Sequence, residues 1–323
     1  MRYFFDGEVM GMMEFYKNFD MAQQPVKIDK IEKGCWINLV TPSEEELSYL
    51  EKNLNILPNF LRDPLDEEEK PRIDVEENQT LLIVDIPYVY EDEKNLKFET
   101  IPMGILIMDE YLVTICNRES YLIDSFKNKK VKEFYTFKKT RFTLQILFMI
   151  AKDFLKYLRH IDKKTDDLEK TLHKSMRNRE LFKLLELEKS LVFFTTSLKS
   201  NDTVMEKLLR GKYIKLYEED QDLLEDVLIE NKQAIEMANI YSTILSGMMD
   251  AFSSVISNNL NMVMKFLTSV TIVMAIPTMI ASFFGMNVPV PWGQNNLGFI
   301  YILSVSFVIA IVTSFALYKK GMF

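Results

Sequence analysis

The feature that most constrains this chain is a long run of residues without any charge. Between Phe266 and Tyr318 lie 53 consecutive residues, none of which is Asp, Glu, Lys, Arg or His. The chain as a whole is rich in charge, with 39 Lys and Arg against 47 Asp and Glu and a net charge of −8. Because the hydrocarbon core of a bilayer disfavours ionised side chains, such a run is typical of membrane-spanning segments. The sequence therefore predicts an acidic soluble part followed by a membrane part.

Two segments of this region are long enough to cross a bilayer as helices. Residues 262–284 carry one charge, at Lys265, and residues 298–318 carry none. At 1.5 Å per residue, these helices would span about 34 Å and about 32 Å. The residues between them, 285–297, contain two prolines and two glycines, which favour a loop. Two spans return the chain to the side from which it entered.

The basic residues beside the two spans predict how they are oriented. Lys265, Lys319 and Lys320 all lie on the side that bears both chain termini, and the connecting loop has no basic residue. Cytoplasmic flanks of membrane helices are enriched in Lys and Arg. We therefore expect a multi-pass protein of the cell (inner) membrane with both termini in the cytoplasm. Residues 319–323 form its basic cytoplasmic tail, and membrane lipid is a predicted partner.

The soluble part divides into a mixed region and a helical region. Residues 1–140 contain three β-rich runs, at 80–86, 103–108 and 111–116, with Asp109-Glu110 as a hairpin turn between the last two. We therefore expect a cytoplasmic domain that combines strands and helices. Thr41 is expected to cap one of its helices, with Pro42 in the first helical position.

Residues 141–261 are predicted to form a helical stalk that leads into the first span. Arg141 to about Lys207 has helical periodicity, and Gly211 fits the end of that region. From about Asp220 to Gly285 the helical pattern scarcely breaks, and apolar residues recur every three or four positions.

Several classes of protein are excluded by the sequence. It lacks phosphate-binding glycine loops and nucleophile motifs, which indicates that the protein is not an enzyme and needs no cofactor. Two Cys without a C-x-x-C pair, and two His, exclude a zinc finger and a disulfide framework. The acidic balance argues against a nucleic-acid partner.

The first span has a polar stripe along one face. On a helical wheel, one third of the circumference holds Met264, Leu267, Thr268, Thr271, Ala275, Thr278 and Ser282. Small and hydroxyl residues in such a stripe suit helix–helix packing in lipid. They also suit the wall of a water-filled pore that several copies of the helix would complete around an axis. The pattern alone leaves both interpretations open.

A resemblance to a known family favours the pore. Gly285-Met286-Asn287 directly follows the first span, and a short loop and a last span ending in lysines follow it. This arrangement resembles the CorA family of divalent-cation transporters. Trp36-Ile37-Asn38-Leu39 with its following Thr-Pro-Ser-Glu-Glu, and residues 261–268, are also similar to that family. The likeness covers nearly the whole chain.

The resemblance implies a funnel-shaped homopentamer in which each subunit contributes one pore-lining helix, so the chain's main partner would be itself. It implies that Gly285, Met286 and Asn287 form the selectivity site at the outer mouth. The pore lining would comprise Met264, Leu267, Thr271, Ala275, Thr278 and Ser282, the first two as a hydrophobic constriction. Lys265, Lys319 and Lys320 would ring the inner end. Glu93 and Asp226 would bind regulatory Mg²⁺ between subunits.

The transported ion is expected to be Mg²⁺, with Co²⁺, Ni²⁺ and Zn²⁺ open. Many family members carry an acid in the outer loop, whereas residues 288–297 here carry no charge. At about 2.3 kcal/mol per charge per 100 mV, a divalent ion gains about 4.6 kcal/mol on entering a negative cell. Two alternatives remain. One is a proton-coupled zinc transporter of the same fold, and the other is a non-conducting, membrane-anchored sensor or scaffold.

Overall fold

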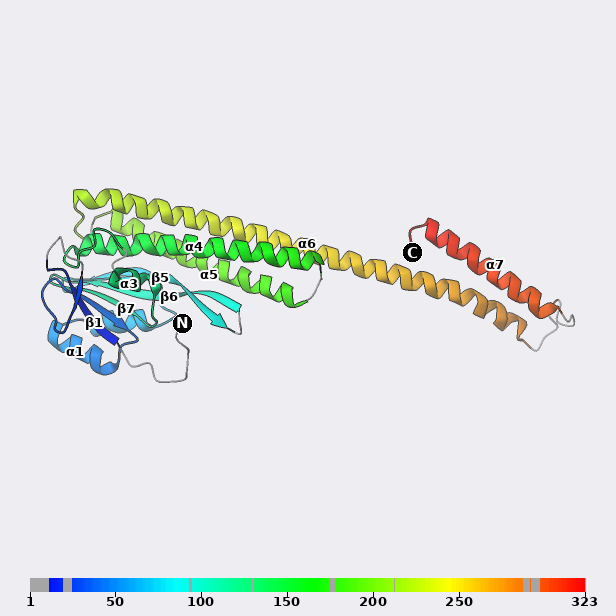
Figure 1. Ribbon diagram of the computed structural model, residues 1–323, viewed down its shortest axis with the longest axis horizontal. Coiled ribbons are helices and arrows are strands. Elements are labelled where there is room, and N and C mark those ends of the chain that lie inside the picture. Colours follow the sequence, from blue (N-terminus) through cyan, green and yellow to red (C-terminus); the bar gives the residue numbers. More distant parts are fainter. Residues whose placement is uncertain are drawn as a thin grey trace. The chain divides into compact units, whose positions relative to one another are not determined.

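The computed structural model describes residues 12–19, 25–92, 95–128, 131–174, 178–211, 213–286, 291 and 297–322. The chain divides into two compact units, Met1–Ser246 and Gly247–Phe323. The first unit contains a mixed β-sheet with helices on both of its faces, and the second contains two helices (Figure 1). Each unit is described separately below.

The sheet of the first unit has seven strands in the order β2-β1-β3-β7-β6-β5-β4. Strands β3 and β7 are parallel, and every other neighbouring pair is antiparallel. The strands span β1 Met12–Lys17, β2 Val26–Ile28, β3 Trp36–Val40, β4 Arg72–Glu76, β5 Gln79–Asp92, β6 Asn95–Ile107 and β7 Leu112–Cys116.

The predicted hairpin turn at Asp109-Glu110 is confirmed. It joins β6 to β7, and the backbone N–H of Met108 donates to the carbonyl of Tyr111 across it, at 3.0 Å. The β-rich runs predicted from the sequence coincide with parts of β5, β6 and β7. These strands lie in the middle of the sheet, and their central residues are buried.

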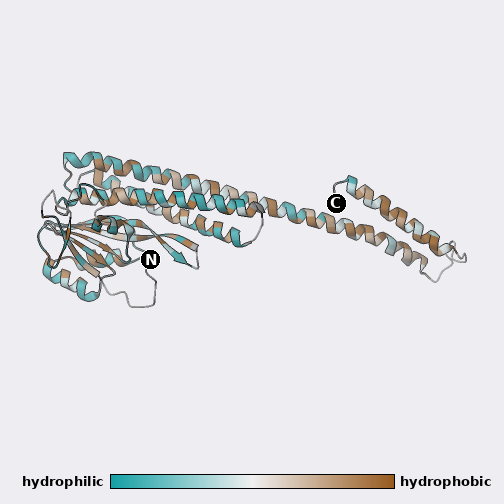
Figure 2. Ribbon diagram, in the orientation of Figure 1, coloured by the Kyte–Doolittle hydropathy of each residue, from teal (hydrophilic) through white to brown (hydrophobic). Residues whose placement is uncertain are grey.

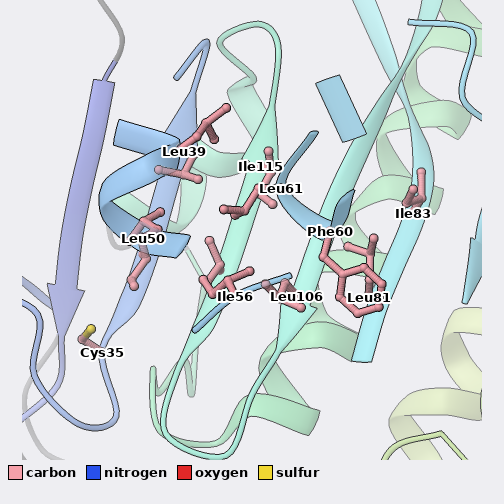
Figure 3. Close-up of a cluster of buried hydrophobic side chains, with 13 residues drawn as sticks. Cys35, Leu39, Leu50, Ile56, Phe60, Leu61, Leu81, Ile83, Leu106 and Ile115 are labelled. Atoms are coloured by element: carbon pink, nitrogen blue, oxygen red, sulfur yellow. The ribbon is translucent and has the colours of Figure 1, made fainter. Parts of the chain in front are cut away.

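Short helices cover one face of the sheet: α1 (Glu44–Leu54), α2 (Pro58–Arg62) and the 3-10 turn η1 (Asp63–Leu65). Between them and the strands lies an apolar core that includes Leu39, Leu50 and Leu61 (Figure 3). Alternation along β3 explains this arrangement. Ile37 and Leu39 belong to this core, and Trp36 and Asn38 point to the other face.

The prediction for the start of α1 is wrong by two residues. Ser43 is the N-cap, since its side chain accepts from the N–H of Glu46 while the Glu46 carboxylate accepts from the N–H of Ser43. This reciprocal capping box satisfies two backbone donors. Thr41 instead belongs to the end of the sheet, because its N–H donates to the carbonyl of Cys116 at 2.9 Å. Pro42 therefore lies outside the helix.

The other face of the sheet carries α3 (Tyr121–Lys127) and two long helices, α4 (Lys139–Lys174) and α5 (Asn178–Leu209). The predicted helical region from Arg141 to Lys207 is thus two helices. Trp36 is fully buried on this face, with its ring 5.2 Å from that of Phe142 and 6.4 Å from that of Phe126. Its indole N–H donates to Thr114 at 2.8 Å, so the buried polar atom has a partner.

Helix α6 (Glu218–Phe284) is continuous over 67 residues, as the periodicity predicted to within two residues at each end. At 1.5 Å per residue it is about 100 Å long. Gly211, with φ of +67°, lies just after α5, and its N–H donates to the carbonyl of Leu208, so the predicted end at Gly211 is confirmed. Helix α7 (Gly298–Lys319) ends the chain.

Candidate ion pathway

The second unit consists of the C-terminal part of α6 and helix α7. Both helices are long and apolar enough to cross a membrane. Figure 2 shows that hydrophobic residues dominate α7 and the end of α6. Nearly all residues of the most apolar stretch of each helix are at least partly exposed in the single chain. Side chains that are apolar and exposed in a single chain need lipid or other protein around them.

One face of α6 is covered by α7. Within the last turns of α6, Ser269 is fully buried, and Val273, Ile276, Ile280 and Phe284 are half-buried. Their spacings of four, three, four and four residues place them in one row along the helix. An apolar cavity of about 180 Å³ lies between this row and α7, lined by Ile280, Phe284, Tyr301, Ile302 and Val305. This row is therefore the packing face of the first span.

Ser269 was not singled out from the sequence, although it belongs to this packing face. Its hydroxyl lies 2.8 Å from the carbonyl of Lys265 and 2.9 Å from that of Met322, which follows α7. The second contact ties the end of the chain to the first span. A single hydroxyl on the otherwise apolar face of the helical wheel is the signal that could have identified it.

The polar stripe lies on the opposite face of α6. At 100° per residue, its centre is about half a turn away from the row that packs against α7. All of its members are exposed in the single chain: Met264, Leu267, Thr268, Thr271, Ala275, Thr278 and Ser282. A shallow hollow follows this face and includes Thr271, Ala275, Thr278 and Ser282. The arrangement leaves the stripe free of α7.

Two hydroxyls of the stripe share a hydrogen-bonding pattern. The Thr271 hydroxyl donates to the carbonyl of Leu267 at 2.8 Å, and the Thr278 hydroxyl donates to that of Met274 at 3.1 Å. Since a hydroxyl has one hydrogen, each of these oxygens has only lone pairs left to offer outward. At these two positions the stripe presents hydrogen-bond acceptors.

Two of the three predicted selectivity residues, Gly285 and Met286, directly follow α6. Gly285 is the first residue after the helix, and its N–H donates to the carbonyl of Ala281 at 2.9 Å. Met286 is 54% exposed. Asn287 lies outside the described residues, so its role remains a prediction.

The three predicted inner basic residues lie near the α7 side of the first span. Lys265 is exposed, about 110° around α6 from the centre of the polar stripe at 100° per residue. Lys319 is the last residue of α7, and the N–H of Lys320 donates to the carbonyl of Ala316 at 3.2 Å. Lys265 therefore lies beside the stripe rather than within it.

The structure describes one residue of the predicted regulatory pair, Asp226. Asp226 is exposed on α6 in the first unit, and Glu93 lies outside the described residues. Within the part of the chain that the structure describes, no group of three or more His, Cys, Asp and Glu could hold a metal ion. The predicted site needs residues from two subunits, so Asp226 remains a candidate ligand by prediction alone.

Comparison with known proteins adds to this geometry. Residues 32–319 match the family described as CorA-like Mg²⁺ transporter protein. The cobalt/magnesium transport protein CorA of Methanocaldococcus jannaschii is 30% identical over 310 residues, covering 91% of this chain and 94% of that protein. The protein of the same name from Thermotoga maritima is 22% identical over 291 residues, covering 88% of this chain and 82% of its own.

A solved structure agrees with these sequence matches. The complete structure of the CorA magnesium transporter from Methanocaldococcus jannaschii matches with a TM-score of 0.82 and 27% identity, covering 97% of this chain and 99% of that chain. The predicted architecture, with a soluble α/β part, a long helix and two C-terminal membrane helices, is thereby confirmed. Members of this family are ion transporters rather than enzymes. The chain described here belongs to the family of CorA-like Mg²⁺ transporter proteins.

Proposed function

We propose that this chain forms a homopentameric channel through which Mg²⁺ enters the cell down the membrane potential. The observation that carries the proposal is the position of the polar stripe on the face of α6 opposite α7. Five such faces turned toward a common axis would enclose a polar path, while α7 would separate the path from lipid. Family membership and the names of the relatives, which include cobalt and magnesium transport, support the choice of ion.

The chemistry of the stripe suits a cation that keeps its water. Mg²⁺ sheds its first hydration shell reluctantly. Water molecules bound to a cation point their hydrogens outward, so the surrounding wall must accept hydrogen bonds. Thr271 and Thr278 are acceptors because each donates its only hydroxyl hydrogen to its own helix. A ring of Asn287 amide oxygens at the outer mouth would act in the same way.

The remaining predicted residues complete this mechanism. Five copies each of Met264 and Leu267 would form an apolar collar that closes by excluding water. Intracellular Mg²⁺ between Asp226 and Glu93 of neighbouring subunits would hold the closed state, giving feedback on uptake. Lys265, Lys319 and Lys320 would mark the cytoplasmic end in the inner membrane, with both termini inside the cell.

The test is ion uptake into proteoliposomes under an inside-negative potential. We expect Asn287→Ala and Thr278→Val to reduce Mg²⁺ influx by about tenfold or more, since a barrier higher by about 1.4 kcal/mol has that effect. The matched control is Thr313→Val. Thr313 lies on α7, and its hydroxyl also donates to its own helix, at the carbonyl of Ile309. Equal influx through the Thr278 and Thr313 variants would contradict the pore assignment.

Two further conditions separate the alternatives. Mg²⁺ inside the vesicles should slow influx, and Asp226→Asn should weaken that effect; an unchanged rate would remove the regulatory role. Parallel uptake of Co²⁺, Ni²⁺ and Zn²⁺, with and without a proton gradient, would identify a zinc transporter. A membrane-anchored sensor or scaffold would give no influx of any ion and would tolerate Thr278→Val.

A further inference from the structure

A hollow in the first unit lies apart from the proposed pore residues. It has a volume of about 270 Å³ and is bounded by the start of β6, the C-terminal half of α4 and the N-terminal half of α5. Its walls are formed by Leu96, Lys97, Lys164, Asp167, Leu168, Thr171, Lys183, Glu186, Leu187 and Ser190. Three lysines from three different elements therefore meet around one cavity.

The three ammonium groups differ in their partners. Lys97 forms an ion pair with Glu186 at 2.7 Å. The Lys164 ammonium donates to the carbonyl of Leu96, at 3.5 Å, and lies 5.2 Å from the centre of the Phe98 ring. Among the residues that the structure describes, no carboxylate lies within 4.0 Å of the ammonium nitrogen of Lys164 or Lys183. Two half-buried ammonium groups of this cavity thus have no ion-pair partner among the described residues.

The acidic residues of the cavity are already engaged. The carboxylate of Glu186 accepts from the ammonium of Lys97, and a carboxylate oxygen of Asp167 lies 3.7 Å from the ammonium nitrogen of Lys170. Burial lowers the pKa of Lys164, and the nearby charge of Lys183 lowers it further. The two ammonium groups, one on α4 and one on α5, therefore repel each other. An anion between them would relieve this repulsion.

The hydroxyl hydrogens of the cavity are already used within the helices, so the lysines are the groups that can donate to a ligand. Thr171 donates to the carbonyl of Asp167 at 2.9 Å, and Ser190 donates to that of Glu186 at 3.0 Å. Leucines form the rest of the wall, which reduces the screening of charges by water. Lysine serves as a point-charge ligand for phosphate groups. Cations on opposite walls favour an anion that carries charge at both ends.

We propose that this hollow binds a small soluble polyphosphate anion, held between Lys164 of α4 and Lys183 of α5. The volume suits an anion of several non-hydrogen atoms rather than a single halide. Lys97 can add a third ammonium at the rim, where it is held by Glu186. The proposal concerns binding alone, so it does not depend on the proposed transport function.

The test is a calorimetric titration of the full-length protein in detergent with inorganic pyrophosphate, in buffer containing EDTA. We expect saturable binding that weakens at high salt. The double variant Lys164→Gln, Lys183→Gln should lose about tenfold or more in affinity, because two charge-assisted hydrogen bonds are removed. The matched control is Lys163→Gln, Lys189→Gln, which changes exposed lysines of the same two helices and should bind as the wild type does.

Three outcomes would overturn the proposal. They are an absence of binding to the wild type, equal losses in the two double variants, and binding of short-chain phosphatidic acid in place of pyrophosphate. The last outcome would assign the hollow to a lipid headgroup. Circular dichroism of each variant ensures that a lost affinity reflects the site rather than a lost fold.

Discussion

Single residues decide where the elements of this chain begin. The Thr-Pro-Ser run before α1 offers two residues that can cap a helix, and the sequence alone does not distinguish them. The sheet decides between them, because the N–H of Thr41 donates to the carbonyl of Cys116, the last residue of β7. Ser43 is then the residue whose side chain caps α1. A tertiary contact thus overrides a local signal, which explains why the helix could be predicted from the sequence and its first residue could not.

The cap at Ser43 can be tested directly. Ser43→Ala removes the acceptor for the Glu46 N–H, so we expect the free energy of unfolding to fall by about 1 kcal/mol. Thermal unfolding of the purified protein, followed by circular dichroism, would show a lower midpoint. Ser43→Asn keeps a side-chain acceptor and should retain most of the stability. A midpoint for Ser43→Ala equal to that of the wild type would show that Thr41 or water replaces the cap.

At the scale of elements, α6 was the most predictable part of the chain. Its apolar periodicity and its charge-free end both persist over many residues, so its limits could be predicted closely. The helical wheel of the first span also distinguished its polar face from its apolar face. Which face α7 would cover could not be deduced, because the buried row from Ser269 to Phe284 is defined by tertiary packing. The hydrogen bonds of Thr271 and Thr278 likewise required coordinates.

Helix α5 completes the hydrogen bonding of β5 where a strand is missing. Strand β4 pairs with β5 only as far as Ile83. Two residues later, Asp85 donates its N–H to the Asn201 side chain at 2.9 Å and accepts from its amide at 2.8 Å. Asn201 is fully buried. A helix side chain therefore takes the place of a strand partner and fixes α5 on the sheet.

Removing this side chain should be costly. Asn201→Ala would leave the part-buried N–H and carbonyl of Asp85 without their side-chain partner, so we expect a loss of about 1–3 kcal/mol of stability. Urea unfolding of the purified protein measures it. The control is Asn239→Ala, which changes an exposed Asn of α6 and should alter the unfolding midpoint little. Similar losses in the two variants would refute the role of Asn201.

At the scale of the whole molecule, the two units differ in how they satisfy their apolar side chains. The first unit buries a continuous core on both faces of its sheet. In the second unit, most large apolar side chains remain exposed, including Phe307 at 68% and Phe315 at 68%. Such surfaces require surroundings other than water, and the sequence already indicated this through its charge-free run. The proposed pentamer and the bilayer together supply those surroundings.

The proposed pentamer can be tested with introduced cysteines. The native thiols interfere little, because both are buried; burial raises the pKa of Cys116 to about 11 and raises that of Cys35 as well. Few thiolates therefore form at neutral pH. After treatment with a short bifunctional reagent, we expect Thr278→Cys to give covalent dimers, because the single introduced thiol of each subunit can be joined to only one neighbour. A ring of five can form at most two such dimers, so about one subunit in five should stay monomeric.

The control for cross-linking is Thr313→Cys on α7, which should remain largely monomeric. Gel electrophoresis under denaturing conditions separates the products. Dimers from the Thr313 variant and none from the Thr278 variant would place α7, rather than the polar stripe, at the common axis.

The hydroxyl pattern of α6 has a consequence for anions. Thr271 and Thr278 donate their hydroxyl hydrogens to their own helix, so chloride passing these two positions would meet electron-rich oxygens and find no donor there to replace its lost water. In the proposed pore, rejection of negative ions would therefore need no fixed carboxylate, which accords with an outer loop that carries no acid. Discrimination by the sign of the charge would be built into the orientation of two side-chain hydrogens.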